Sequence, residues 1–133
     1  MRGLFQRGGK AGRPAAGEGA PRMKAIVIDP GTEPVVKTVP ETLQALGATC
    51  GGALTLLRFP LDAAGLLYME GAHSRGLEQN RQFRGQWYYG RLLIVGVAPY
   101  GVRFRSLTPE QIAMYTAKWR EAVVPYEKVR WPG

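Results

Sequence analysis

The chain has 133 residues, a length that fits one globular domain rather than two. No apolar run approaches the ~20 residues of a membrane-spanning helix, and the longest strongly apolar stretch, Leu92 to Val97, has the length of a strand. The single cysteine, Cys50, excludes an internal disulfide and a paired-cysteine metal site, which fits a reducing cytoplasm.

Half of the formal net charge of +8 lies in residues 1–22, which hold five basic residues and one acid. Gly, Ala, Pro and Arg dominate this segment, so it cannot bury enough apolar surface to offset the entropy of ordering it. We therefore predict a disordered basic tail over residues 1–22. The tail lacks the apolar centre of a signal peptide, and the sequence leaves open whether translation starts at Met1 or Met23.

The first half of the ordered region reads as strands around one short helix. β-Branched and apolar residues between turn signals predict strands over 24–29, 35–39, 53–59 and 66–69. The short link between the first two strands favours an antiparallel hairpin. The segment 41–47 predicts a helix, in which Leu43 and Leu46 share a face and Gly47 ends the helix.

The second half combines an irregular segment with a well-marked closing unit. Residues 71–86 show no clear period, and loops of that length are usually functional or mobile. Residues 87–97 predict one strand, and a turn and a short basic strand follow. Thr108 as N-cap, with Pro109 and Gln111 behind it, predicts a helix whose buried face continues to Trp119. Residues 120–133 then form a loosely ordered extension.

Several blocks carry a family resemblance: MKAIVIDPGTEPVVKTV, the Gly51-Gly52 turn, EGAHSRGLEQNR, and YGRLLIVGV followed by FRSLTPEQIAMY. In this order and spacing, they resemble the DUF3846 family, whose members are small uncharacterised proteins of bacteria, plasmids and phages. The resemblance covers residues 23–119. It implies a small mixed α/β fold and no established activity, and a fold alone would not license a function.

The irregular segment supplies the first candidate binding residues, Arg75, Asn80 and Arg81. Arg and Asn side chains suit planar recognition of phosphate, carboxylate or a base edge. The alternative is structural: Asn80 satisfies backbone groups of the loop while the arginines are solvated.

A second candidate set is Arg103 and Arg105 on either side of Phe104, together with the aromatic run 87–89 on the preceding strand. Basic and aromatic residues on strands can form a stacking surface for single-stranded nucleic acid. Alternate residues of a strand point to opposite faces, so Phe104 can equally belong to the core with both arginines outside.

No catalytic or metal-binding set stands out. His73 is the only histidine, and catalysis through it would need a partner such as Cys50 or Glu70 close in space. A solvated histidine and a buried structural thiol are the ordinary roles of these residues. We therefore predict no catalytic residues, no metal site and no cofactor.

The sequence thus predicts one α+β domain over residues 23–119, with a small, mainly antiparallel sheet and two helices packed on one face. The favoured function is a non-catalytic binding or accessory protein, of the kind that mobile elements carry, with an unidentified protein or small ligand as partner. One alternative is non-specific, weak nucleic-acid binding through the basic tail and the Arg/aromatic strand. Another is a small-ligand or nucleotide site at residues 71–86. The sequence predicts no membrane partner and leaves the oligomeric state open.

Overall fold

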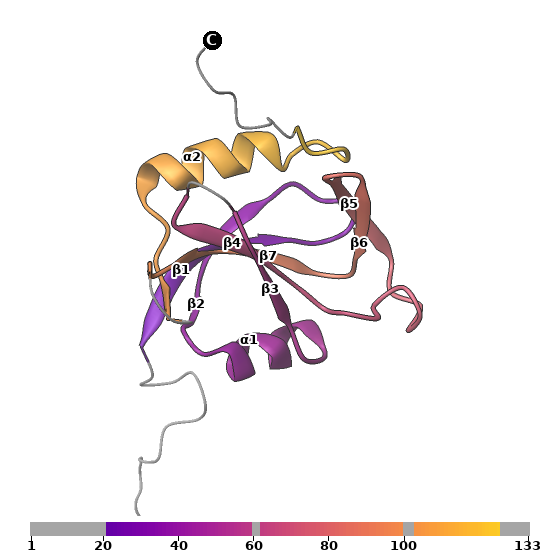
Figure 1. The fold of residues 1–133 in the computed structure, drawn as a ribbon, viewed down its shortest axis with the longest axis horizontal. Helices are drawn as coiled ribbons and strands as arrows, with labels where there is room; N and C mark the ends of the chain where they lie inside the picture. The colour runs from indigo at the N-terminus through magenta and orange to yellow at the C-terminus, as the bar shows by residue number, and fades with distance from the viewer. Residues whose placement is uncertain (1–20, 60–61, 100–102, 126–133) are drawn as a thin grey trace, which may run out of the picture.

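The computed structural model describes residues 21–59, 62–99 and 103–125. Most of the tail predicted over residues 1–22 lies outside these ranges, as do residues 126–133 of the predicted extension. Two residues of the turn predicted at Pro99 to Gly101 also lie outside them. The described residues form a six-stranded sheet, a two-stranded hairpin and two helices (Figure 1).

The large sheet is built around its most apolar strand, with antiparallel pairing between all of its strands. Its strand order is β2-β1-β7-β4-β3, and β8 pairs with the end of β7. All six residues of β7 are buried, because β7 has neighbours on both sides and its faces are both covered. The predicted α+β class with a mainly antiparallel sheet is confirmed. The strands are β1 (Arg22–Ile28), β2 (Val35–Pro40), β3 (Thr55–Arg58), β4 (Ala64–Tyr68), β7 (Leu92–Val97) and β8 (Phe104–Arg105).

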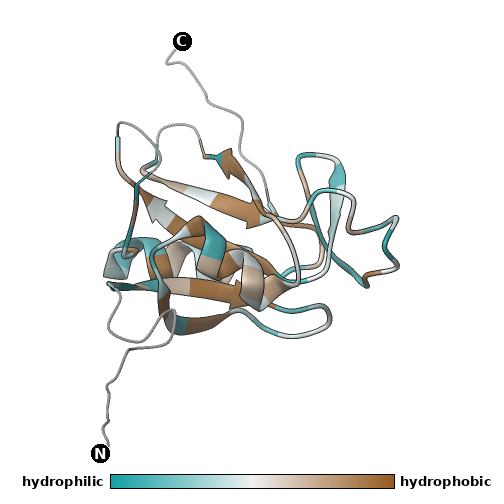
Figure 2. Cartoon of the chain, turned by 90° about the horizontal axis from the view of Figure 1, so that it is seen from below, coloured by the Kyte–Doolittle hydropathy of each residue, from teal (hydrophilic) through white to brown (hydrophobic). Residues whose placement is uncertain are grey.

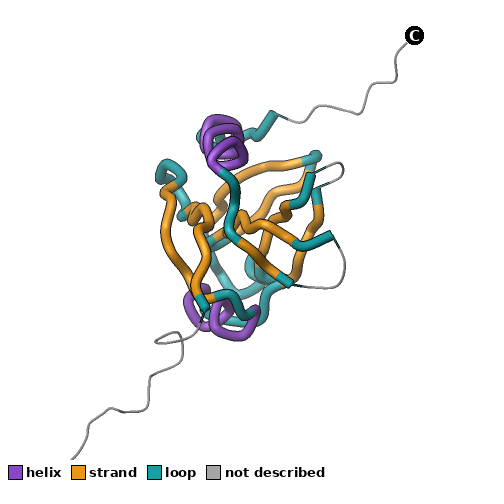
Figure 3. The backbone as a smooth tube through the Cα atoms, turned by 90° about the vertical axis from the view of Figure 1, so that its left-hand side faces the viewer, coloured by secondary structure: helices purple, strands orange, loops and turns teal. Residues whose placement is uncertain are grey.

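The two helices lie on opposite faces of this sheet, so the prediction that they share one face is wrong (Figures 1 and 3). α1 (Leu43–Cys50) places Leu46 in one core cluster, and α2 (Pro109–Lys118) places Tyr115 in the other. The reason lies in β1, whose successive side chains alternate between faces. Its apolar residues Ala25 and Ile26 belong to different clusters, so each face needs a cover.

Local signals explain how both helices begin and end. The predicted capping box at the start of α2 is confirmed, since Thr108 and Gln111 exchange side-chain to backbone hydrogen bonds. The predicted end of α1 at Gly47 is wrong. Gly51 is the C-cap with φ 97°, whereas Gly47 is buried inside the helix, where the backbone oxygen of Gly52 would lie 2.6 Å from an added Cβ.

The segment 71–86, expected to lack regular structure, contributes a whole strand. β5 (Gln79–Phe83) and β6 (Gln86–Tyr89) form a separate hairpin, whose turn places Arg84 and Gly85 at φ 55° and 77°. The strand predicted over 87–97 is divided into β6 and β7. In β5 polar residues face the interior, so the usual apolar alternation is missing from the sequence. Figure 2 shows this part of the molecule pale to teal beside the mostly brown large sheet.

Part of the predicted C-terminal extension lies against the hairpin. The Gln82 N–H donates to the Ala122 carbonyl at 2.8 Å, and the Val124 N–H donates to the Gln82 carbonyl at 2.8 Å. Val124 is buried in the same cluster as Trp119. Residues 122–124 therefore belong to the packed domain.

Candidate functional site

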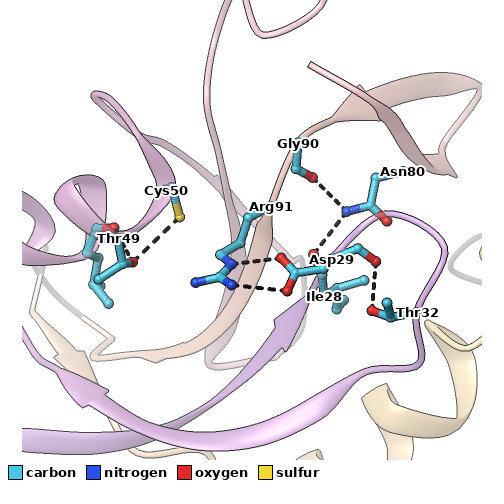
Figure 4. Close-up of polar contacts among 9 residues, drawn as sticks. Ile28, Asp29, Thr32, Thr49, Cys50, Asn80, Gly90 and Arg91 are labelled. Atoms are coloured by element: carbon cyan, nitrogen blue, oxygen red, sulfur yellow. Dashed lines mark hydrogen bonds and ion pairs between the residues drawn. The ribbon is translucent and has the colours of Figure 1, made fainter.

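Asn80, the first of the predicted binding residues on β5, is buried and holds three strands together. Its Nδ2 donates to the carbonyl of Ile28 at 2.9 Å and to that of Gly90 at 2.6 Å (Figure 4). These acceptors end β1 and precede β7. Asn80 is therefore a structural residue that fixes the hairpin to the large sheet.

Arg81 is also buried, with 4% of its surface exposed, and its guanidinium is surrounded by oxygen acceptors. Nε donates to the Trp119 carbonyl at 2.7 Å, Nη2 to the Thr32 carbonyl at 2.6 Å, and Nη1 to Asn80 Oδ1 at 2.9 Å. Burial lowers the pKa of the Arg81 guanidinium. The side chain connects β5 to the β1–β2 link and to the end of α2, so it is not available to a ligand.

The predicted Arg/aromatic surface is not assembled. Arg105 lies on β8, two residues after Arg103, and β8 pairs with the C-terminal end of β7. The aromatic run 87–89 lies on β6, which pairs with β5. Figure 1 shows the hairpin at one end of the sheet, away from β8. Phe104 is buried in the α1-side core and both arginines are exposed, which matches the structural alternative.

A polar cluster, which the sequence did not single out, lies where β1 ends and β7 begins. Arg91 and Asp29 form a bidentate ion pair with N–O distances of 2.7 and 3.0 Å, and Arg91 lies between Asp29 and the end of α1 (Figure 4). Hydrogen bonding to Arg91 lowers the pKa of Asp29. Burial raises the pKa of the nearby Cys50 thiol, which makes Cys50 a weak nucleophile at neutral pH.

A largely apolar groove lies beside α1. It has a volume of about 620 Å³ and is lined by the helix and by the segment that leads from it to β3: Leu43, Gln44, Gly47, Ala48, Gly51, Gly52, Ala53 and Leu54. A second hollow of about 370 Å³ shares Leu43 and reaches β3 at Leu56. We call these two hollows together the α1–β3 groove. α1 is short, and the glycines at 47 and 52 allow its backbone to approach this segment closely.

Of the predicted residues, Arg103 lines the α1–β3 groove, in the hollow near Leu43 and Leu56. Arg75 does not line the groove but contacts the segment that follows α1: Nη2 donates to the Gly51 carbonyl at 3.3 Å and Nη1 contacts Met69 Sδ at 2.9 Å. Asn80, Arg81 and Arg105 do not line the groove.

An aromatic hollow of about 340 Å³ lies between the end of β4 and β6. His73 stacks on Tyr89 with ring centroids 4.4 Å apart, and Tyr68 meets Tyr88 edge to face at 4.9 Å. Glu70 also lines this hollow, which is the surface that the 71–86 segment offers to a small ligand.

Comparison with known protein families identifies the family of this chain. The model of the domain of unknown function DUF3846 matches residues 23–120, which is nearly the whole described domain. The chain belongs to the DUF3846 family. The resemblance predicted over residues 23–119 is thus confirmed. Comparisons of this DUF3846 chain with curated proteins and with solved structures found no match.

The described residues offer neither a membrane-spanning helix nor a cluster of metal ligands. No helix within them is long and apolar enough to span a membrane. Within the same residues, no three His, Cys, Asp or Glu side chains gather as a metal site would require.

Sequence reasoning missed the α1–β3 groove, although one signal for it was present. Residues 43–50, LQALGATC, contain no charged side chain, and yet Leu43, Gln44, Ala48 and Thr49 are exposed. Surface helices normally carry charged residues on their outer face. A surface helix without charge is typical of one that a partner covers.

Proposed function

We propose that this DUF3846 chain is a non-catalytic binding protein whose ligand is a segment of another protein, and that the α1–β3 groove is the binding surface. The observation that carries the proposal is the coincidence of the apolar groove with a surface helix that has no charged residue. Leu43 stands at the centre of the groove with 44% of its surface exposed. A contiguous apolar surface rimmed by polar residues marks an interaction site, and Leu43 joins two apolar hollows into one such surface.

The groove has the dimensions and chemistry of a site for an extended segment. Its two hollows share Leu43 as a lining residue, and their linings extend from α1 to Leu56 on β3. Few titratable groups line it, and of the described residues in contact with it only Glu41 and Arg103 are charged. Such a lining favours burial of apolar side chains over recognition of a highly charged ligand.

The geometry of the potential catalytic residues supports a non-catalytic role. Cys50 has a raised thiol pKa, and the contact of its sulfur with Thr49 Oγ1 is 3.8 Å. The His73 ring is stacked on Tyr89. Nucleophilic catalysis needs a thiolate or a hydroxyl with a base in hydrogen-bond reach. Neither Cys50 nor His73 stands in that arrangement.

Site-specific photo-crosslinking tests the proposed surface. A photoreactive amino acid replaces Leu43, and the matched control places the same group at Met114, which is exposed to 41% on α2 at the opposite face. The proposal predicts that position 43, but not position 114, crosslinks in the native host to one defined protein. The substitution Leu43→Asp should abolish that product when the crosslinker is placed at Ala48. Equal crosslinking from positions 43 and 114 would contradict the proposal that the α1–β3 groove is the binding surface.

The aromatic hollow favours a second candidate, a small ligand bound beside residues 71–86. Its rings and the Glu70 carboxylate give apolar contact with one polar anchor, as small-molecule sites do. Saturation-transfer NMR with a fragment library tests this candidate. Hits should disappear on Tyr89→Ala and persist on Leu43→Asp.

A further inference from the structure

The outer edge of β3 is the feature that defines how a segment can enter the α1–β3 groove. β3 stands last in the strand order, and within the described part of the chain its strand partner is β4 alone. It is a short strand of four residues beside the apolar lining of the groove. Unpaired strand edges are the usual template for addition of a further strand.

The hydrogen-bond register shows which backbone groups face outward. The Phe59 N–H donates to the Ala64 carbonyl at 3.0 Å, and Leu57 and Leu66 are opposite one another two residues along. In an antiparallel pair, hydrogen-bonded and non-hydrogen-bonded positions alternate. The backbone N–H and C=O of Leu57 therefore face β4, and those of Leu56 face the outer edge.

The side chain of Leu56 shows which face an added strand would use. Leu56 packs against the α1-side core and lines the groove together with Leu43 and Phe104. Side chains of a strand alternate between the two faces of the sheet. A segment paired with the Leu56 edge would therefore direct every second side chain into the α1–β3 groove.

The added strand could come from a second copy of the chain, from its own N-terminal residues or from another protein, and charge distinguishes these three sources. The chain carries a net charge of +8. Arg103 and Glu41 both line the groove near Leu43, and Arg75 contacts the Gly51 carbonyl beside the other part of the groove. A second copy of the chain would bring the same positive charge to the same place, and like charges at an interface are unfavourable. Residues 1–20 of the chain itself contain four basic residues and one acid, so they are disfavoured for the same reason. An acidic partner is complementary to the net charge of the chain.

We propose that the partner contributes an extended segment that pairs with the Leu56 edge of β3, with apolar side chains at alternate positions in the α1–β3 groove and acidic residues beside Arg103 and Arg75. This inference rests on the proposed function, because it specifies the ligand of the same groove. The backbone pairing supplies affinity, the alternate apolar positions set the register, and the acidic ends select against copies of this chain.

The probe for this proposal is a synthetic peptide of alternating valine and threonine with two glutamates at each end. Amide exchange of the full chain is followed by NMR with and without the peptide at millimolar concentration. The Leu56 amide, which faces outward, should exchange at least about tenfold more slowly when the peptide is bound. The Leu57 amide is the internal control, because it already faces β4 and should change little.

Two peptide variants and one protein variant complete the test. N-methylation should abolish binding when it blocks the peptide N–H groups that face β3. N-methylation of the other alternate residues, whose N–H groups face away from β3, should leave binding intact. A peptide with lysines in place of the terminal glutamates should bind the natural chain at least about tenfold more weakly than the glutamate-ended peptide. The substitution Arg103→Glu should reduce this difference in affinity between the two peptides.

The outcomes separate this inference from the proposed function. Peptide binding at Leu43 without slowed exchange at Leu56 would refute strand addition while leaving the groove as a binding surface. Equal affinity for the two peptides would refute the acidic partner. Peptide binding to β3 with no crosslinking partner at position 43 would support strand addition and contradict a protein ligand in the host.

Discussion

Asn80 and Arg81 are adjacent in the chain, and their side chains are joined by a 2.9 Å hydrogen bond from Arg81 Nη1 to Asn80 Oδ1. Successive strand residues normally point to opposite faces. Here the register of β5 shifts between Gln79 and Arg81, and both Asn80 and Arg81 are buried. A β-bulge of this kind redirects side chains, and it allows one dipeptide to fasten the hairpin, the sheet and the end of α2.

We expect Asn80→Ala to lower the free energy of unfolding by about 2–4 kcal/mol, because the Ile28 and Gly90 carbonyls lose their donor at a buried position. Arg81→Ala should cost a similar amount. Urea unfolding measures both, and Arg105→Ala, at an exposed position, is the control that should remain within about 0.5 kcal/mol of the natural chain. If the double variant lost as much free energy of unfolding as the two single variants combined, Asn80 and Arg81 would not be energetically coupled.

The Asp29–Arg91 ion pair makes part of the stability depend on pH. The folded-state pKa of Asp29 is lowered by its hydrogen bond to Arg91, so the pair stabilises the fold above the unfolded pKa near ~4. That contribution disappears as the pH falls through the lower, folded pKa. The Arg91 and Asp29 side chains are 34% and 40% exposed, so we expect a contribution of about 0.5–1 kcal/mol. The stability difference between the natural chain and Asp29→Asn should therefore be largest at pH 6–7, roughly two to three units above the unfolded pKa, and shrink at acidic pH.

Gly47→Ala should destabilise the protein although alanine is the better helix former. Helix propensity favours the substitution by about 1 kcal/mol. The added Cβ would lie 2.6 Å from the Gly52 backbone oxygen, which cannot rotate away, and overpacking costs about 1–3 kcal/mol. We expect a net loss of about 1–2 kcal/mol on thermal or urea unfolding. Ala48→Gly, at an exposed position of the same helix, is the matched control; it should lose about 1 kcal/mol through propensity alone.

Thr108→Ala should lower stability by about 1 kcal/mol, because the first turn of α2 loses the acceptor for the Gln111 N–H. Thr108→Ser keeps a hydroxyl at the cap and should be close to neutral. Thermal melting compares the two. Equal losses would show that the methyl group of Thr108, rather than the cap, is responsible.

Any binding to nucleic acid should be weak, non-specific and strongly dependent on salt. The basic residues are scattered, and the aromatic run on β6 lies away from Arg103 and Arg105. Affinity would then come from phosphate neutralisation alone. Fluorescence anisotropy at several salt concentrations is the measurement, with Arg103→Ala expected to reduce the salt slope by about one at most. Tight binding that survives high salt would require base readout and contradict this prediction.

Strong local signals made much of the fold predictable. The strands over 24–29 and 35–39 and the capped helix at Thr108 correspond to β1, β2 and α2, because β-branched runs, turn pairs and a capping box are set by residues close in sequence. β5 was missed because two of its three buried residues, Asn80 and Arg81, are polar. Only contacts with Ile28, Thr32 and Trp119, far away in the chain, make that burial favourable.

For the candidate site, too, some features follow from the sequence and others only from the tertiary structure. The sequence by itself determined the α+β class, the DUF3846 membership and the positive charge. Tertiary structure alone decided that Asn80 and Arg81 are structural, that the helices cover opposite faces, and that Arg103 lines a groove beside α1. The physical reason is that exposure and proximity depend on long-range strand order and register, which residues near in sequence do not encode.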